Sequence, residues 1–170
     1  MKTIEKPRRN LLIVDDEPEL LEILGTMVEM QGYSYETATD GQEALAKIRS
    51  FDFHAIMSDI SMPNLDGVEL LRFVQAKNLV IPLIFVTAFD SSEQVQEALR
   101  LGAFDFVTKP FRTEDLNRVT ARAIDFGKRS LKIQSQVLEA MGTLSSAKEV
   151  LRESKMLGLL RAQNRLKKVA

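Results

Sequence analysis

Short apolar runs alternate with amphipathic segments five times along the first three quarters of the chain. The runs are LLIV (11–14), SYETA (34–38), AIMS (55–58), LIFVT (83–87) and FDFVT (104–108). Segments with apolar residues at helical spacing follow them at 18–30, 42–49, 67–76 and 92–101, and a fifth starts near Thr113. This alternation with short connections predicts a parallel sheet that is covered by helices on both faces. The nearly all-apolar first, third and fourth runs are expected to be inner strands, and the other two to lie at the edges.

Charged and hydroxyl side chains stand at the ends of four of these runs. Asp15 and Asp16 follow the first run, Asp59 follows the third, Thr87 ends the fourth and Lys109 follows the fifth. Ligands of an open parallel sheet bind outside the carboxyl ends of its strands. We therefore expect these five residues to gather at one rim of the sheet.

Such a group suits the chemistry of a phosphoryl group. Three carboxylates in one pocket repel one another, and a hard divalent cation such as Mg²⁺ offsets that repulsion with oxygen ligands. Lys109 adds a positive charge for a phosphate oxygen, and Thr87 adds a hydroxyl donor. Asp59, which stands alone at its strand end, is the candidate nucleophile.

A plainer interpretation applies to a single Asp after a strand, which is usually a turn residue or the N-cap of a helix. Asp40 and Asp66 fit that interpretation, and Glu17 fits the first turn of a helix better than a ligand position. Turn chemistry does not explain carboxylates, a hydroxyl and a lysine at four strand ends together.

Four motifs resemble the receiver domain of bacterial two-component response regulators. They are LLIVDDEPE (11–19), SDISMPNLDGVELL (58–71), VTA (86–88) and FVTKPF (106–111). The resemblance covers residues 9–127 and implies a flavodoxin-like, doubly wound sheet of five parallel strands in the order 2-1-3-4-5. It also implies a switch protein rather than an enzyme, which receives a phosphoryl group from a sensor histidine kinase or a phosphotransfer protein.

The resemblance also implies roles for individual residues at the acidic site. Asp59 looks like the phosphoacceptor, and Asp15 and Asp16 resemble the pair that binds Mg²⁺ together with it. Ser61 stands where the family uses a backbone carbonyl as a further metal ligand. These assignments rest on the motifs.

A second set of implied roles concerns switching. Thr87 and Lys109 look like the pair that senses the phosphate, and Phe106 stands at the position of the switch aromatic. The Lys109–Pro110 peptide bond is expected to be cis, as in the family. Phe89, two residues after Thr87, is bulky, and we expect it to restrict attacking water and to prolong the phosphorylated state.

The remaining chain predicts a helical extension. We divide the chain into a tail (1–8), a receiver (9–127) and an extension (128–170). Apolar residues recur at alternating spacings of three and four through 113–144, which is typical of a heptad seam. Gly142 and Thr143 are expected to end this helix, and SAKE (146–149) resembles a capping box that opens a second one.

The composition limits the partners of this extension. Residues 128–170 hold ten Lys and Arg against three Asp and Glu, whereas the whole chain has a net charge of −1. A homodimer through the C-terminal helices is our first expectation, a partner-binding arm the second, and nucleic acid the third. Gly127 beside the seam is expected to mark a hinge or a break.

Other classes of protein fit less well. The chain has no Cys and one His, which excludes disulfides and disfavours zinc, and no apolar run reaches the length of a membrane span. We expect a cytoplasmic protein with no membrane contact. An Asp-nucleophile, Mg-dependent phosphatase needs a second Asp two residues after the first, where this chain has Ser61. A DNA-binding transcriptional regulator, or a piece of a longer protein with an output domain, remains open.

Overall fold

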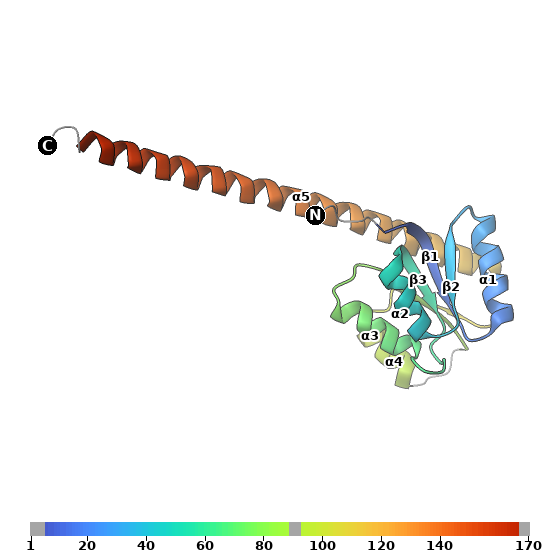
Figure 1. The fold of residues 1–170 in the computed structure, drawn as a ribbon. Helices are drawn as coiled ribbons and strands as arrows, with labels where there is room; N and C mark the ends of the chain where they lie inside the picture. The colour runs from blue at the N-terminus through green and yellow to red at the C-terminus, as the bar shows by residue number, and fades with distance from the viewer. Residues whose placement is uncertain (1–5, 89–92, 167–170) are drawn as a thin grey trace. The chain divides into compact units, whose positions relative to one another are not determined.

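The computed structural model describes residues 6–88 and 93–166 of the 170-residue chain (Figure 1). Strands and helices alternate along it. The strands are β1 (Arg8–Val14), β2 (Tyr35–Ala38), β3 (Asp52–Ser58), β4 (Leu83–Thr87) and β5 (Asp105–Thr108). The helices are α1 (Pro18–Met30), α2 (Gly41–Ser50), α3 (Gly67–Ala76), α4 (Glu93–Arg100) and α5 (Thr113–Leu166).

The five strands form one parallel sheet in the order β2-β1-β3-β4-β5. This confirms the predicted sheet, its strand order and the placing of the second and fifth runs at the edges. β1, β3 and β4 are apolar because both of their faces are covered.

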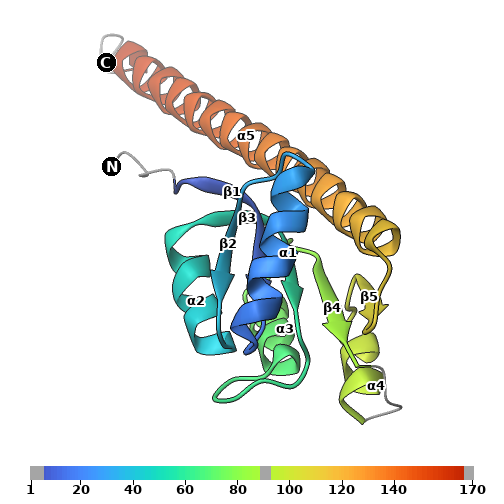
Figure 2. The same ribbon diagram turned by 90° about the vertical axis from the view of Figure 1, so that its right-hand side faces the viewer.

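Two apolar clusters fill the two faces of the sheet. On one face, α1 and the first turns of α5 pack against strand residues such as Leu11, Met57 and Ile84. On the other face, α2, α3 and α4 cover residues that include Leu12 and Phe85. Figure 2 shows α1 in front of the sheet and α3 behind it. The fold is therefore the doubly wound arrangement that the alternation predicts.

Two predicted N-caps lie where the sequence places them. The Asp40 carboxylate accepts a hydrogen bond from the backbone N–H of Glu43 at the start of α2. The Asp66 carboxylate accepts from the N–H of Glu69, whose own side chain accepts from the N–H of Asp66, so that a reciprocal capping box opens α3. These bonds fix where α2 and α3 begin beside the sheet.

Several predicted boundaries were wrong by a few residues. β1 begins at Arg8, inside the predicted N-terminal tail, and β3 begins at Asp52 rather than at Ala55. The extra residues pair with each other, since Arg8 is the register partner of Asp52. Ladder hydrogen bonds extend these strands past the apolar runs from which they were predicted.

The prediction of two helices in the extension was wrong, because α5 continues without a break from Thr113 to Leu166. Gly142 lies inside it, and no atom beyond its own turns comes within 4 Å of a Cβ placed there. One glycine costs a helix only about 1 kcal/mol relative to Ala, which good helix formers on either side offset. The predicted capping box at 146–149 is therefore helix interior.

Gly127 does not break α5 either. A Cβ at this position would lie 1.7 Å from the backbone oxygen of His54, which shows how closely α5 passes over β3. The glycine is required for helix-to-strand packing and not for a hinge. His54 itself lies within β3 and is half-buried.

The chain divides into two compact units, Met1–Leu131 and Lys132–Ala170. The first holds the sheet and its helices, and the second holds the turns of α5 from Lys132 to Leu166. Within the ranges 6–88 and 93–166, none of the helices is both long and apolar enough for a membrane span.

Candidate functional site

The carboxyl ends of neighbouring strands lie side by side at one edge of the sheet. The register pairs Val14 of β1 with Ser58 of β3, and Ser58 with Phe85 of β4. It also pairs Thr87 at the end of β4 with Thr108 at the end of β5. The residues that directly follow these strands are thereby brought to the same place.

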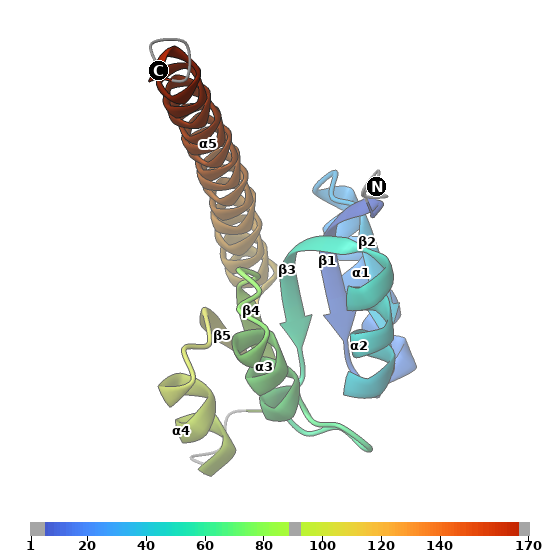
Figure 3. The same cartoon turned by 60° about the vertical axis from the view of Figure 1, so that its left-hand side comes forward.

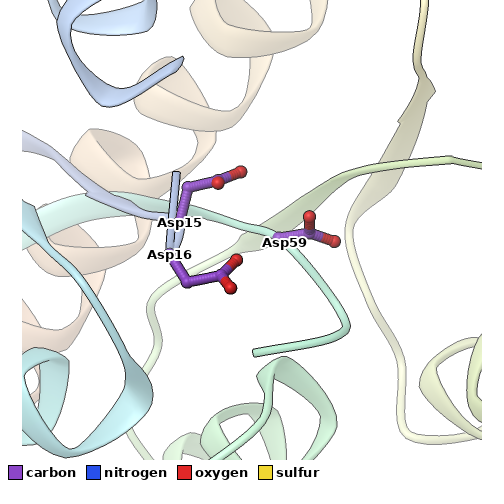
Figure 4. A group of neighbouring side chains, drawn as sticks. All are labelled: Asp15, Asp16 and Asp59. Carbon is purple, nitrogen blue, oxygen red and sulfur yellow. The ribbon is translucent and has the colours of Figure 1, made fainter. Parts of the chain in front are cut away.

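Three carboxylates meet at this edge. Asp15 and Asp16 follow β1 and Asp59 follows β3, and one oxygen from each lies within 4.8 Å of the other two (Figure 4). Asp15 is 1% exposed, Asp59 is half-buried and Asp16 is open to solvent. Carboxylate oxygens in such a group are the ligands that a hard divalent cation prefers.

Lys109, which directly follows β5, joins the carboxylates. Its Nζ donates to Oδ2 of Asp59 at 2.8 Å and to Oδ2 of Asp15 at 3.1 Å. Glu17 adds a longer ion pair of 3.8 Å. The Lys109–Pro110 bond is cis, as expected, and the N–H of Lys109 donates to the oxygen of Thr87.

Burial and hydrogen bonds shift the pKa values of Asp15 and Lys109. Burial raises the pKa of Asp15 above the ordinary 3.8, against a hydrogen bond from the N–H of Glu17 and the nearby charge of Lys109. Burial alone would lower the pKa of Lys109, but its bonds to Asp59 and Asp15 outweigh burial and raise it above 10.5. The lysine is therefore held in its charged form between two acids.

A pocket of about 240 Å³ opens beside Asp59 and Lys109. Ser61 and Thr87 line it, and so does Glu17, whose backbone is the N-cap of α1. Interpreting Glu17 as a plain first-turn residue missed this position, because the side chain reaches the pocket from just outside the helix. The pocket is smaller than the roughly 300–1,000 Å³ of pockets that hold drug-sized ligands.

Comparison with known proteins identifies the family. Residues 11–121 match the family model of the response regulator receiver domain. This chain belongs to the response regulator receiver family. A solved CheY-like receiver from Methanospirillum hungatei is 30% identical, with a TM-score of 0.66, over 74% of this chain and 99% of that one. The solved receiver of NtrX from Brucella abortus has a TM-score of 0.64 at 30% identity, over 68% of this chain and 98% of that one.

Curated relatives of this receiver are named as regulators. The transcriptional regulatory protein TrcR of Mycobacterium tuberculosis is 35% identical over 154 residues, which are 88% of this chain and 59% of TrcR. The regulatory protein AtoC of Escherichia coli is 35% identical over 73% of this chain and 27% of AtoC. The chain thus spans less than two thirds of the length of either relative.

Two further residues of the receiver were expected to take part in switching. Thr87 is buried at the end of β4, where it lines the pocket. Phe106 of β5 is half-buried, and its ring centroid lies 5.5 Å from that of Phe85. Phe89 lies outside the described residues.

The donor set of the receiver fits a divalent cation. Asp15, Asp16 and Asp59 offer three negative charges, of which the single charge of Lys109 offsets one. Ser61 lies at the same pocket, and its hydroxyl donates to Gln94 at 3.4 Å. Sequence patterns could not have found Gln94, because only the packing of α4 brings it beside the loop that follows β3.

Replacing Asp15 by Asn is expected to stabilise the metal-free receiver near neutral pH. The folded pKa of Asp15 lies above 3.8, so the stability that this carboxyl contributes is present below about pH 4 and lost as the pH rises through the folded value. Asn cannot ionise, and its side-chain oxygen can still accept from the N–H of Glu17. Urea unfolding should give equal midpoints near pH 4 and a higher midpoint for the variant near pH 7.

The same variant should lose most of the stabilisation that added Mg²⁺ gives the wild type, since a ligand that binds the folded state stabilises it. Asp40→Asn is the matched control, because Asp40 caps α2 outside the acidic group. A lower midpoint for Asp15→Asn than for the wild type at both pH values would contradict this account of the burial of Asp15.

Proposed function

We propose that this chain is a phosphorylation switch whose acceptor is Asp59. The observation that carries the proposal is the contact of Lys109 with both Asp59 and Asp15, in a group that also includes Asp16. A carboxylate nucleophile between a cation and a metal-binding acidic pair is arranged for phosphoryl transfer.

The phosphoryl donor is a phosphohistidine of a sensor kinase or a phosphotransfer protein. An oxygen of Asp59 attacks phosphorus, and the bond between phosphorus and the imidazole nitrogen breaks. The imidazole leaves with the electron pair and takes up a proton. Lys109 stays charged through this step, because its raised pKa keeps the ammonium protonated, and it neutralises one phosphoryl oxygen.

Asp15, Asp16, Asp59 and the backbone carbonyl of Ser61 would hold Mg²⁺. When bound, the cation supplies positive charge for the phosphoryl oxygens and removes the repulsion among the carboxylates. The buried position of Asp15 restricts its side chain, and Asp16 faces solvent from the next position along the chain.

Thr87 and Phe106 relay the change at Asp59. The Thr87 hydroxyl donates to the phosphoryl group and moves toward it. Phe106, on the neighbouring strand β5, then shifts against Phe85. The two arrangements form a two-state element whose balance the phosphoryl charge changes.

A direct test is the Mg²⁺-dependent phosphorylation of the whole chain by a small phosphoryl donor such as acetyl phosphate. Intact-mass measurement should show one added phosphoryl group, which hydroxylamine removes as expected for an acyl phosphate. The reaction should stop when a chelator removes Mg²⁺. Absence of the modification at saturating donor and Mg²⁺ would reject the proposed function.

The extension of α5 is proposed to pair with a second copy of the chain. Ile133, Val137 and Leu144 lie on one side of the helix at heptad spacing with Ala140, and each of the three larger side chains is more than half exposed. A single uninterrupted helix offers this seam to a second copy better than a hairpin, in which the two helices would cover each other. Pairing two copies buries both seams.

Replacing Val137 by Asp is expected to weaken this association at least about tenfold, because a carboxylate would be buried in the seam. Leu138→Asp is the matched control, since Leu138 is 64% exposed against 52% for Val137 but lies off the seam. Light scattering of the whole chain gives the oligomeric state.

Added salt should tighten the wild-type dimer by screening the repulsion between the basic extensions.

If Val137→Asp and Leu138→Asp associate equally strongly, the seam does not mediate pairing. A monomeric wild type at every concentration and phosphorylation state would leave the extension as a partner-binding arm.

Transcription control is the output that the relatives favour, since TrcR is named as a transcriptional regulatory protein. The basic extension supports contact with DNA as a second candidate. Binding of the whole chain to duplex DNA that falls steeply with salt would support it, whereas a lack of binding at low salt would reject it. The phosphatase alternative is disfavoured, because an Asp-nucleophile phosphatase needs a second Asp two residues after the first, where this chain has Ser61.

A further inference from the structure

Helix α4 has little apolar anchorage. Among the described residues it spans Glu93–Arg100, eight residues, and buries the side chains of Val95 and Ala98. Helix α3 beside it has ten residues, Gly67–Ala76, and buries four side chains larger than glycine (Val68, Leu70, Leu71 and Val74). Since apolar burial is the main force that holds a helix on a sheet, polar contacts have a larger share in positioning α4.

Gln94, in the first turn of α4, makes two such contacts. Its Oε1 accepts from the hydroxyl of Ser61 at 3.4 Å, and its Nε2 donates to Oδ2 of Asp66 at 3.2 Å. Figure 3 shows α3 and α4 next to each other, and an ion pair between Arg72 and Glu97 joins them further along. Gln94 differs from that pair because it reaches the loop that carries Asp59.

The two ends of this loop are thereby tied to one side chain. Ser61 lies two residues after Asp59 and lines the pocket, and Asp66 is the N-cap of α3. The other Asp66 oxygen already accepts from Glu69, so the carboxylate is shared between the start of α3 and Gln94. A displacement of the start of α4 has to break both bonds of Gln94.

The contacts of Gln94 coexist with a direct contact between Lys109 and the Asp59 carboxylate at 2.8 Å. A phosphoryl group on Asp59 has to displace that contact and enter the pocket that Ser61 and Thr87 line. Ser61 is bonded to α4 through Gln94 and also lines the pocket. The arrangement of α4 and the occupation of the pocket are therefore linked through Ser61.

We propose that Gln94 is a positioning residue that latches α4 to the acceptor loop while the Asp59 carboxylate is paired with Lys109. The proposal rests on the proposed function of Asp59. Because the latch stabilises the carboxylate-paired arrangement, its bonds oppose the arrangement that carries a phosphoryl group. By linkage, cutting the latch favours the phosphorylated arrangement.

The test is a calorimetric titration of the whole chain with beryllofluoride, a phosphoryl analogue, in the presence of Mg²⁺. Gln94→Ala removes both bonds. Loss of one or two such bonds predicts an affinity for the analogue that is roughly three- to tenfold tighter than that of the wild type. Gln94→Glu should act in the same direction, because its carboxylate repels Asp66.

Gln96→Ala is the matched control, since Gln96 is an exposed glutamine of the same helix. It reproduces the change in helix propensity without touching the loop, and its affinity should equal that of the wild type. Amide exchange over 93–100 should rise in Gln94→Ala and not in Gln96→Ala.

The outcomes separate the latch from the function on which it rests. A wild type that neither binds beryllofluoride nor accepts a phosphoryl group would reject the proposed function and the latch with it. A wild type that binds, beside a Gln94→Ala variant with equal or weaker affinity, would reject the latch alone. A merely supporting role of Gln94 predicts weaker binding, so the sign of the change decides.

Discussion

Replacing Gly127 by Ala is expected to lower the free energy of unfolding of the receiver by about 3 kcal/mol, at the upper end of what overpacking costs. The added methyl would lie 1.7 Å from the backbone oxygen of His54 and 2.7 Å from its carbonyl carbon. Backbone atoms in the middle of a sheet cannot turn aside as a flexible side chain can. The helix, the strand or both have to move.

The surrounding packing limits that movement. Leu116, Ala123 and Ile124 of α5 are almost fully buried against the sheet, so lifting the helix at Gly127 exposes apolar surface and opens voids. Tyrosine fluorescence in a urea titration gives the measurement, because both tyrosines of the chain, Tyr33 and Tyr35, lie in the receiver.

Gly142→Ala is the matched control in the same helix. No atom outside the helix's own turns lies within 4 Å of a Cβ at that position. The substitution should favour local helix by about 1 kcal/mol and leave the urea midpoint of the receiver unchanged. Equal midpoints for Gly127→Ala and the wild type would contradict the close approach of α5 to β3.

These two glycines also show where prediction from the sequence fails. Both stand in or beside a helical pattern, and both were expected to end or bend a helix. The pattern does not distinguish a glycine that meets a distant strand from one that meets nothing. The close approach at Gly127 is set by His54, whose proximity arises only from the tertiary fold.

The strand ends were predictable for the opposite reason. In a parallel sheet all carboxyl ends share one edge, so Asp15, Asp59 and Lys109 could be placed together without knowledge of any side chain. What the strand pattern could not supply was the participation of Gln94 and Glu17. Their positions depend on how α1 and α4 pack against the loops at the carboxyl edge of the sheet.

Asp59→Asn is expected to abolish phosphorylation by acetyl phosphate. The amide is not a nucleophile, but its oxygen can still accept from the N–H of Ile60, as the carboxylate does. Lys109 keeps its bond to Asp15, so the receiver should remain folded. Intact mass after reaction with the donor and Mg²⁺ should show no added phosphoryl group.

Asp66→Asn is the matched control on the same loop, because Asn caps helices about as well as Asp and should preserve the start of α3. This variant should still accept one phosphoryl group, because Asp66 lies outside the acidic group that holds the acceptor. Modification of Asp59→Asn at the wild-type rate would move the acceptor to Asp15 or Asp16. Loss of modification in both variants would indicate damage to the loop rather than loss of the acceptor.

Asp59→Asn also tests how the charge of the acidic group affects Mg²⁺ binding. With Asp59 neutral, the group retains two carboxylates against one lysine, so its affinity for Mg²⁺ should fall while the fold persists. If the extension pairs in response to phosphorylation, Asp59→Asn should remain at the unphosphorylated level of association when the donor is added, whereas Val137→Asp should accept the phosphoryl group without pairing. Phosphorylation would then be lost only in Asp59→Asn, and pairing of a phosphorylated chain would be lost only in Val137→Asp. The acceptor site and the pairing helix would thus be shown to act separately.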